Sequence, residues 1–206
     1  LLNVKTVAFR REKVLSLRLP EAVYHEAGCT GTALLELQEK YHYERVFFLT
    51  DRYLYQNENV IPVLKLLERM GVMYTVHCDL APNLTAEQVE RGITALERFQ
   101  PDAIVSMGGG TVLDAAKLMR YRWEHPEVSW EGLRLNFLDD RKRVLEAEKR
   151  EQKTPLFTIA TTAGTGAECT PCAVVTDEKT GVPWQIYHPE LLPTAAIIDA
   201  DHMKCL

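Results

Sequence analysis

Residues 104–117 read I-V-S-M-G-G-G-T-V-L-D-A-A-K, and this stretch decides the fold. Residues 103–107 are apolar apart from Ser106, which predicts a short strand that is covered on both faces. Residues 111–121 contain good helix formers, with Asp114 in the first turn. Because only three glycines separate the two segments, the stretch predicts a buried strand that turns directly into a helix.

The glycine turn is also a candidate phosphate cradle, formed by Gly108, Gly109, Gly110 and Thr111. Glycine lets the backbone approach a ligand without a Cβ in the way, and the free N–H groups at a helix start attract an anion. The spacing is not G-x-G-x-x-G, so the common dinucleotide fingerprint is not met. Taken alone, the turn is equally consistent with a tight connection that holds no ligand.

Length and composition indicate a globular chain with a core of its own. It has 206 residues, of which 46% are hydrophobic, enough for one large α/β domain. The net charge of −5 is spread over interspersed acids and bases, which predicts no basic surface for nucleic acid or an anionic membrane. No apolar run approaches the roughly 20 residues of a membrane helix, and we find no secretory segment.

The five cysteines are an odd number in a chain too long to need a disulfide framework, which favours a reducing compartment. Cys169 and Cys172 have the C-x-x-C spacing of a redox pair. A strand-like run, 173–175, follows them where a thioredoxin-like motif needs a helix, so we do not expect redox chemistry there. We therefore expect a cytoplasmic protein.

Strand and helix patterns alternate along the chain, which predicts a parallel sheet with right-handed crossovers. The expected strands are 17–24, 45–50, 72–78, 103–107, 154–160 and 195–198, and the expected helices are 33–40, 60–70, 85–99 and 111–121. Residues 173–176 and 184–187 flank D-E-K-T-G, which is a hairpin signature. The predicted fold class is α/β, a Rossmann-like parallel sheet with flanking helices plus a β-hairpin. Residues 139–150 read as a charged, solvated helix.

Polar residues follow several of these strands. Asp51 comes directly after one, where α/β folds often hold a ribose; it could equally, and compatibly, cap the next helix. The loop 79–84, with Asn83, follows a second strand, and T-T-A-G-T-G-A-E at 161–168 follows a third. Because the carboxyl ends of parallel strands share one edge of a sheet, these loops predict a ligand crevice.

The motif G-G-G-T-x-x-D-A-A-K, followed later by T-T-A-G-T-G-A-E-x-T, resembles the cofactor-binding half of the iron-dependent (group III) alcohol dehydrogenases. The opening L-L-N-V-K-T-V-A-x-R-R-E, E-H-P-E at 124–127 and D-D-R-K-R at 139–143 are similar to one branch, the bifunctional aldehyde-alcohol dehydrogenases. There an aldehyde dehydrogenase half is joined by a linker to the alcohol dehydrogenase half. The resemblance implies a linker at 1–16, an NAD-binding α/β domain at 17–206, and a piece of a longer protein.

The resemblance also implies a cofactor site. Its residues would be Asp51, Asn83, Gly108, Gly109, Gly110, Thr111, Asp114, Thr161, Thr162 and Thr165. The glycine turn would hold the pyrophosphate, and Asp51 would take the adenosine ribose and favour NAD over NADP. The threonines would line the adenine and ribose side, and Asn83 would lie in the loop beside the crevice.

By the same resemblance the whole protein reduces acetaldehyde to ethanol with NADH and forms a homo-oligomer or filament. The family's iron is bound by one aspartate and three histidines of a helical domain that follows, so the metal ligands and catalytic groups are expected outside this chain. The run D-A-D-H at 199–202 is not expected to replace them, because adjacent residues do not easily converge on one metal. The other histidines are expected to be surface or packing residues.

Two departures from the family pattern are evident. Members carry a lysine shortly after the hairpin glycine, where this chain has V-P-W at 182–184, and Leu84 replaces a common proline. Two alternatives remain: a non-catalytic assembly module of a filament-forming enzyme, and a sister family on the same fold, such as a polyol (glycerol) dehydrogenase or dehydroquinate synthase. The E-H-P-E and linker matches argue against the sister families.

Overall fold

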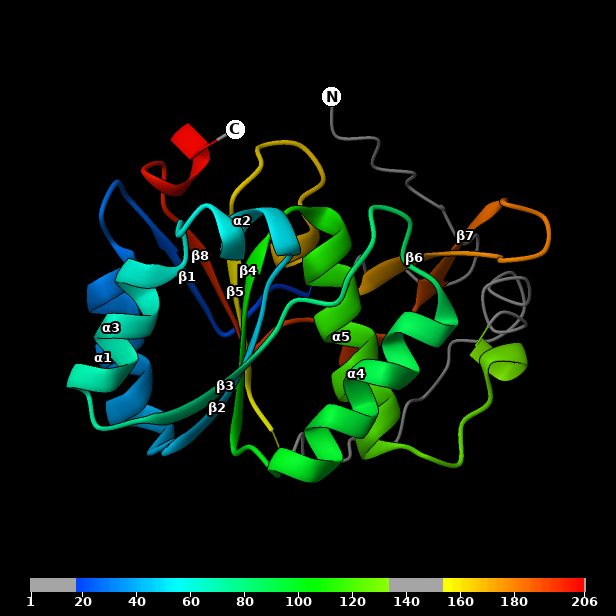
Figure 1. Cartoon of the computed structure of the whole chain (residues 1–206), viewed down its shortest axis with the longest axis horizontal. Helices are drawn as coiled ribbons and strands as arrows, with labels where there is room; N and C mark the ends of the chain where they lie inside the picture. The colour runs from blue at the N-terminus through cyan, green and yellow to red at the C-terminus, as the bar shows by residue number, and fades with distance from the viewer. Residues whose placement is uncertain (1–17, 134–153, 206) are drawn as a thin grey trace, which may run out of the picture.

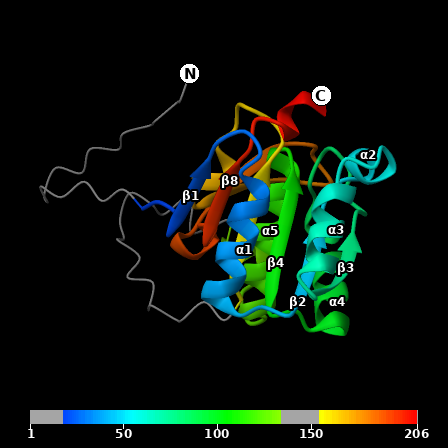
Figure 2. The same cartoon turned by 90° about the vertical axis from the view of Figure 1, so that its left-hand side faces the viewer.

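The computed structural model describes residues 18–133 and 154–205. The linker predicted for 1–16, the helix predicted for 139–150 and the D-D-R-K-R motif lie outside the described residues. A six-stranded parallel sheet forms the centre, and Figure 2 shows its strands from β1 on the left to β3 on the right. In sheet order the strands are β1 (Ala22–His25), β8 (Ala195–Ile198), β5 (Leu156–Ala160), β4 (Ala103–Gly108), β2 (Arg45–Leu49) and β3 (Met73–His77).

Helices cover both faces of this sheet (Figure 1). On one face lie α1 (Thr30–Tyr41) and α3 (Ile61–Arg69), and on the other α4 (Ala86–Phe99) and α5 (Gly110–Glu124). The antiparallel hairpin of β6 (Cys172–Thr176) and β7 (Pro183–Tyr187) packs against α5. The described chain also contains short helical turns: α2 (Arg52–Gln56), η1 (Ala167–Cys169), η2 (Pro189–Leu191) and η3 (His202–Cys205). The predicted fold class is confirmed.

The alternation of side chains along each strand explains the two helical layers. In β2, Val46 and Phe48 pack with α1 and α3, whereas Phe47 and Leu49 pack with α4 and α5. Successive side chains of a strand point to opposite faces, so a strand between two layers is predominantly apolar on both faces. Every residue of β4 is buried for this reason. None of the described helices is long and apolar enough to cross a membrane.

The first predicted strand was wrong in its bounds. Residues 17–24 were expected, but β1 begins only at Ala22, after Pro20, and pairs with β8 alone. Proline has no N–H to donate to a neighbouring strand, so the pairing starts beyond it. Helix α1 begins earlier than predicted, at Thr30, because the distant Asp199 carboxylate accepts its backbone N–H (3.1 Å). A partner so far along the chain leaves no local signal.

Candidate functional site

The carboxyl ends of the strands meet at one edge of the sheet, and a cavity of about 550 Å³ opens there. In the sheet, β2 lies between β3 and β4. The chain runs from β2 outward to β3 on one side, then returns to β4 and continues outward to β5 and β8 on the other side, so the strand order reverses between β2 and β4. Ligands of open α/β sheets bind at such a reversal. The lining residues are Asp51, Arg52, Tyr53, Leu54, Leu80, Ala81, Pro82, Gly109, Gly110, Thr111, Val112, Thr161 and Thr162.

The lining brings together a majority of the residues predicted from the sequence. Asp51, Gly109, Gly110, Thr111, Thr161 and Thr162 all line the cavity. Four other predicted residues, Asn83, Gly108, Asp114 and Thr165, are not in its lining. The loop predicted at 79–84 contributes Leu80, Ala81 and Pro82 to the lining. Tyr53 and Leu54 of α2 also line the cavity and were not predicted as site residues.

The glycine turn begins α5 without a side-chain cap. Gly109 is the N-cap residue, and no side chain accepts a hydrogen bond from the first turn of this helix. Gly110 and Thr111 line the cavity, so the first N–H groups of the helix, which have no acceptor within an α-helix, belong to cavity residues and provide a seat for an anion. An anionic cofactor group fits this cradle because its oxygens can accept the hydrogen bonds that a side-chain cap would otherwise accept.

Close packing within the protein explains why glycine is required in the turn. A Cβ on Gly108 would lie 2.6 Å from the Cβ of Val112, and one on Gly110 would lie 2.8 Å from Cγ2 of Thr165. Both distances are shorter than van der Waals contact. None of the three glycines has a positive φ angle. The glycines thus let α5 pack closely on its own strand and on the loop after β5.

Two hydrogen-bonded side chains fix the loop at 79–84 beside the turn. Thr111 Oγ1 donates to the carbonyl of Pro82 (3.2 Å), and the buried Gln88 accepts from Ala81 N (3.1 Å) and donates to the carbonyl of Asn83 (3.1 Å). The loop is therefore fastened to both α4 and α5, while the Asn83 side chain is exposed. Sequence reasoning missed Gln88, which reads as an ordinary polar residue in the first turn of a helix.

Asp51 is the N-cap residue of α2. Its carboxylate accepts a hydrogen bond from Leu54 N (2.8 Å), which confirms the capping role predicted as one of its two functions. The ribose role stays a prediction. Arg52, which sequence reasoning did not single out, lines the cavity and forms an ion pair with Asp79 (3.3 Å). Both partners are largely exposed, so the pair contributes little to stability.

Asp114 joins α5 to the hairpin. One carboxylate oxygen is 3.1 Å from Lys117 Nζ, and the other accepts from Val174 N (3.0 Å). Lys117 is fully buried and also donates to the carbonyl of Cys172 (2.7 Å). Burial raises the pKa of Asp114 and lowers the pKa of Lys117, because desolvation outweighs the attraction between the two groups. The carboxylate is thus held by the hairpin, outside the cavity lining.

Asp199, the residue after β8, joins that strand to the start of α1. Asp199 is buried and accepts hydrogen bonds from Gly28 N (2.7 Å) and from Thr30 Oγ1 (2.7 Å). His202 Nε2 lies 2.8 Å from the same Thr30 hydroxyl. In 18–133 and 154–205, no group of three or more His, Cys, Asp or Glu side chains could hold a metal ion. Cys169 and Cys172 are free thiols.

The predicted histidine roles agree with the described positions. His25 and His42 are exposed, and His77 stacks on Phe47 with ring centroids 5.8 Å apart. His125 and His188 are buried. Both of their rings pack against that of Tyr121, each with a centroid distance of 4.7 Å.

Comparisons with known proteins find related sequences. The profile of the family described as iron-containing alcohol dehydrogenase matches residues 20–200. The chain is 37% identical over 203 residues to an aldehyde-alcohol dehydrogenase of Clostridium acetobutylicum, covering 98% of this chain and 23% of that protein. It is 38% identical over 201 residues to the bifunctional aldehyde-alcohol dehydrogenase AdhE of Escherichia coli K12, covering 98% and 22%. The chain therefore spans less than a quarter of these relatives.

Solved structures share the fold. An iron-containing alcohol dehydrogenase from Thermococcus thioreducens matches with a TM-score of 0.78 at 23% identity, over 93% of this chain and 48% of that one. A sulfoacetaldehyde reductase from Bifidobacterium kashiwanohense in complex with NAD⁺ matches with a TM-score of 0.76 at 20% identity, over 93% and 48%. The chain thus corresponds to about half of each solved chain.

Proposed function

This chain belongs to the iron-containing alcohol dehydrogenase family, and on that premise we propose that it is the NAD(H)-binding portion of an alcohol dehydrogenase that reduces acetaldehyde to ethanol. The observation that carries the proposal is the cavity at the carboxyl edge of the sheet, where α5 starts without a side-chain cap. The names of its relatives support a bifunctional aldehyde-alcohol dehydrogenase as the whole protein. Oligomer or filament formation by that protein belongs to the same proposal.

Each part of the cavity has a role in the proposal. The pyrophosphate would accept hydrogen bonds from the N–H groups at the start of α5, where the helix dipole also favours negative charge. Asp51 would accept hydrogen bonds from the adenosine ribose hydroxyls, and its charge would repel the 2′-phosphate of NADP. The cavity volume of about 550 Å³ is in the range of cofactor sites. Thr161 and Thr162 would contact the adenine and ribose side.

The chain's contribution to the reaction is binding and orientation. The family's iron, when bound, supplies a Lewis acid that polarises the carbonyl of the substrate. Its ligands are expected outside this chain, and we assign no proton-transfer group among the described residues. We therefore expect the 206-residue chain to bind NADH and to turn over no substrate.

The test separates the two functions of Asp51. Asp51→Ser keeps an oxygen that can cap α2 but removes the charge, so the variant should unfold at the same temperature as the wild type. Its affinity for NADH, measured by fluorescence titration, should fall about 10-fold or more, since hydrogen bonds to charged groups contribute about 1.5–3 kcal/mol. Discrimination against NADPH should fall as well. Glu97→Gln, at the far end of α4, is the control.

Two outcomes would contradict the proposal. One is a chain that does not change NADH fluorescence; the other is an Asp51→Ser variant that binds NADH as tightly as the wild type. A chain that binds no nucleotide but self-associates would support the alternative of a non-catalytic assembly module.

A further inference from the structure

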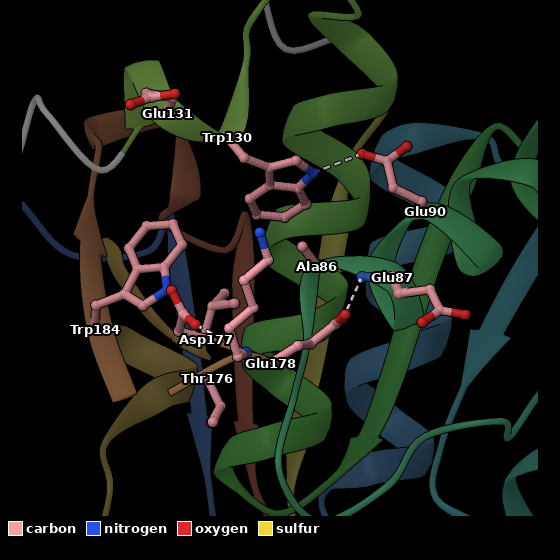
Figure 3. A pocket seen from close by; sticks show the side chains of 11 residues that line it. Ala86, Glu87, Glu90, Trp130, Glu131, Thr176, Asp177, Glu178 and Trp184 are labelled. Atoms are coloured by element: carbon pink, nitrogen blue, oxygen red, sulfur yellow. Dashed lines mark hydrogen bonds between the residues drawn. The ribbon is translucent and has the colours of Figure 1, made fainter. Parts of the chain in front are cut away.

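A second cavity, of about 540 Å³, lies beside α4 and shares no residue with the cofactor crevice (Figure 3). It opens between the first turns of α4, the tip of the β6–β7 hairpin and the segment around Trp130. Its lining residues are Ala86, Glu87, Glu90, Trp130, Glu131, Val175, Thr176, Asp177, Glu178, Lys179 and Trp184. We call it the tryptophan cavity. The proposed function uses none of these residues.

Two indole rings, those of Trp130 and Trp184, border the cavity (Figure 3). The Trp130 ring is held in place because its Nε1 donates a hydrogen bond to Glu90 (2.9 Å). Trp184 belongs to β7, opposite Val175 of β6, so the hairpin pairing fixes its backbone. The face of an indole ring is electron-rich and attracts cations that also have apolar or planar surface.

The charges of the lining are mostly negative. Five carboxylates line the cavity, against the single ammonium group of Lys179. Some of these carboxylates already have cationic partners, since Glu87 pairs with Arg91 (3.1 Å) and Glu90 with Arg122 (3.0 Å). The exposed Glu131 and Glu178 add negative charge beyond these pairs. An anionic ligand would therefore be repelled and a cation attracted.

One side chain of the chain itself, Arg122, already contacts an indole ring and a carboxylate of the lining. The guanidinium carbon of Arg122 lies 5.7 Å from the centroid of the Trp130 ring, and its Nη2 is 3.0 Å from Glu90 Oε1. A guanidinium group stacks on aromatic faces and donates paired hydrogen bonds to carboxylates, which an ammonium group does less well. The same indole ring lines the cavity, together with Glu178 and, at its edge, the exposed Glu131.

We propose that the tryptophan cavity binds an arginine side chain presented by a partner polypeptide. The guanidinium group would stack against the indole rings and donate hydrogen bonds to Glu178, and Glu131 would add negative charge at the edge of the cavity. Free arginine fits less well, because its own carboxylate would meet the acidic lining; in a peptide that charge is absent. Lys179 is the competing cation of the chain itself, so removing its charge should strengthen binding.

Calorimetry with blocked peptides tests the proposal. The probes are acetyl-Gly-Arg-Gly-amide, the same peptide with lysine, the same peptide with citrulline, which is a neutral isostere of arginine, and free arginine. The arginine peptide should bind about 10-fold more tightly than the citrulline peptide, and its affinity should fall as salt rises. Binding of citrulline or of free arginine as tightly as the arginine peptide would overturn the proposal.

Variants link the binding to the cavity. The double substitution Glu131→Gln and Glu178→Gln should weaken the arginine peptide about fivefold to tenfold, and Lys179→Met should strengthen it. Both side chains are exposed, and glutamine at position 178 can still accept the hydrogen bond from Glu87 N (3.4 Å), so the unfolding temperature and the NADH titration should stay unchanged. Unchanged peptide affinity in the double variant would refute the proposal even if NADH binding is confirmed. Glu97→Gln again serves as the control for a lost surface charge.

Discussion

Replacing Lys117 by methionine tests how α5 is joined to the hairpin. Lys117→Met keeps the length of the side chain but removes its amine. The amine is fully buried, lies 3.1 Å from the Asp114 carboxylate and donates to the carbonyl of Cys172 (2.7 Å). The substitution therefore leaves a buried carboxylate without its cation and a carbonyl without its donor.

The expected loss in the free energy of unfolding follows from these contacts. Removing one partner of a buried ion pair destabilises a protein by about 3–5 kcal/mol. Asp114 keeps the hydrogen bond from Val174 N, so we expect a loss of about 3 kcal/mol in the free energy of unfolding at pH 8. Burial already raises the pKa of Asp114, and the loss of Lys117 raises it further. Because the folded state of the variant then binds the proton more tightly than the unfolded state, its deficit should shrink as the pH falls toward 5.

Urea unfolding at pH 8 and pH 5 measures both effects. Lys117→Met combined with Asp114→Asn removes both charges, so the double variant should be more stable at pH 8 than Lys117→Met alone. Lys65→Met, at an exposed position of α3, is the control and should cost less than about 0.5 kcal/mol. A Lys117→Met variant that loses less than about 1 kcal/mol would refute the reasoning. So would a double variant whose loss equals the sum of the losses of Lys117→Met alone and Asp114→Asn alone.

Two further predictions concern the glycine turn and the half-buried His77. Gly108→Ala should lower the unfolding temperature by several degrees because its Cβ would meet Val112 at 2.6 Å, whereas Gly164→Ala, with no atom within 4 Å, should change it little; equal effects would contradict this. Burial lowers the pKa of His77, so the unfolded state takes up the proton first and stability should fall as the pH drops from 7.5 to 5.5. His77→Phe, which can keep the stacking on Phe47, should reduce that slope in chemical unfolding curves, and the exposed His25→Gln should not.

The sequence predicted the layers of the fold well because hydrophobic periodicity is a local signal. The strand β4 and the helix α5 lie within a few residues of their predicted bounds, and the hairpin lies where D-E-K-T-G predicted it. What failed depends on hydrogen bonds that hydrophobic periodicity does not detect. Helix α1 starts where the distant Asp199 accepts the N–H of Thr30. Gln88 is buried because its side chain bonds to Ala81 and Asn83 in the loop that precedes its own helix.

The candidate site was predicted in part for a similar reason. The glycine turn and Asp51 stand at strand ends, which the sequence identifies, and Asp51, Gly109, Gly110 and Thr111 line the cavity. The Asp114 carboxylate could not be placed from the sequence, since its partner Val174 lies in the hairpin. A residue's position in a helix is local information, whereas the face that it presents to a neighbour depends on the packing.

The spacing of the motif around the turn can be explained by that packing. Gly110, Asp114 and Lys117 stand at positions i, i+4 and i+7 of α5 and therefore lie on one face of the helix. On that face Gly110 makes room for Thr165, Asp114 accepts from the hairpin backbone, and Lys117 donates to it. The N–H groups that would hold a phosphate belong to the backbone, and any residue other than proline could supply them. It follows that the side chains of this motif chiefly fix the position of the helix start relative to the loop after β5 and the hairpin, and that they act on a bound phosphate through that position.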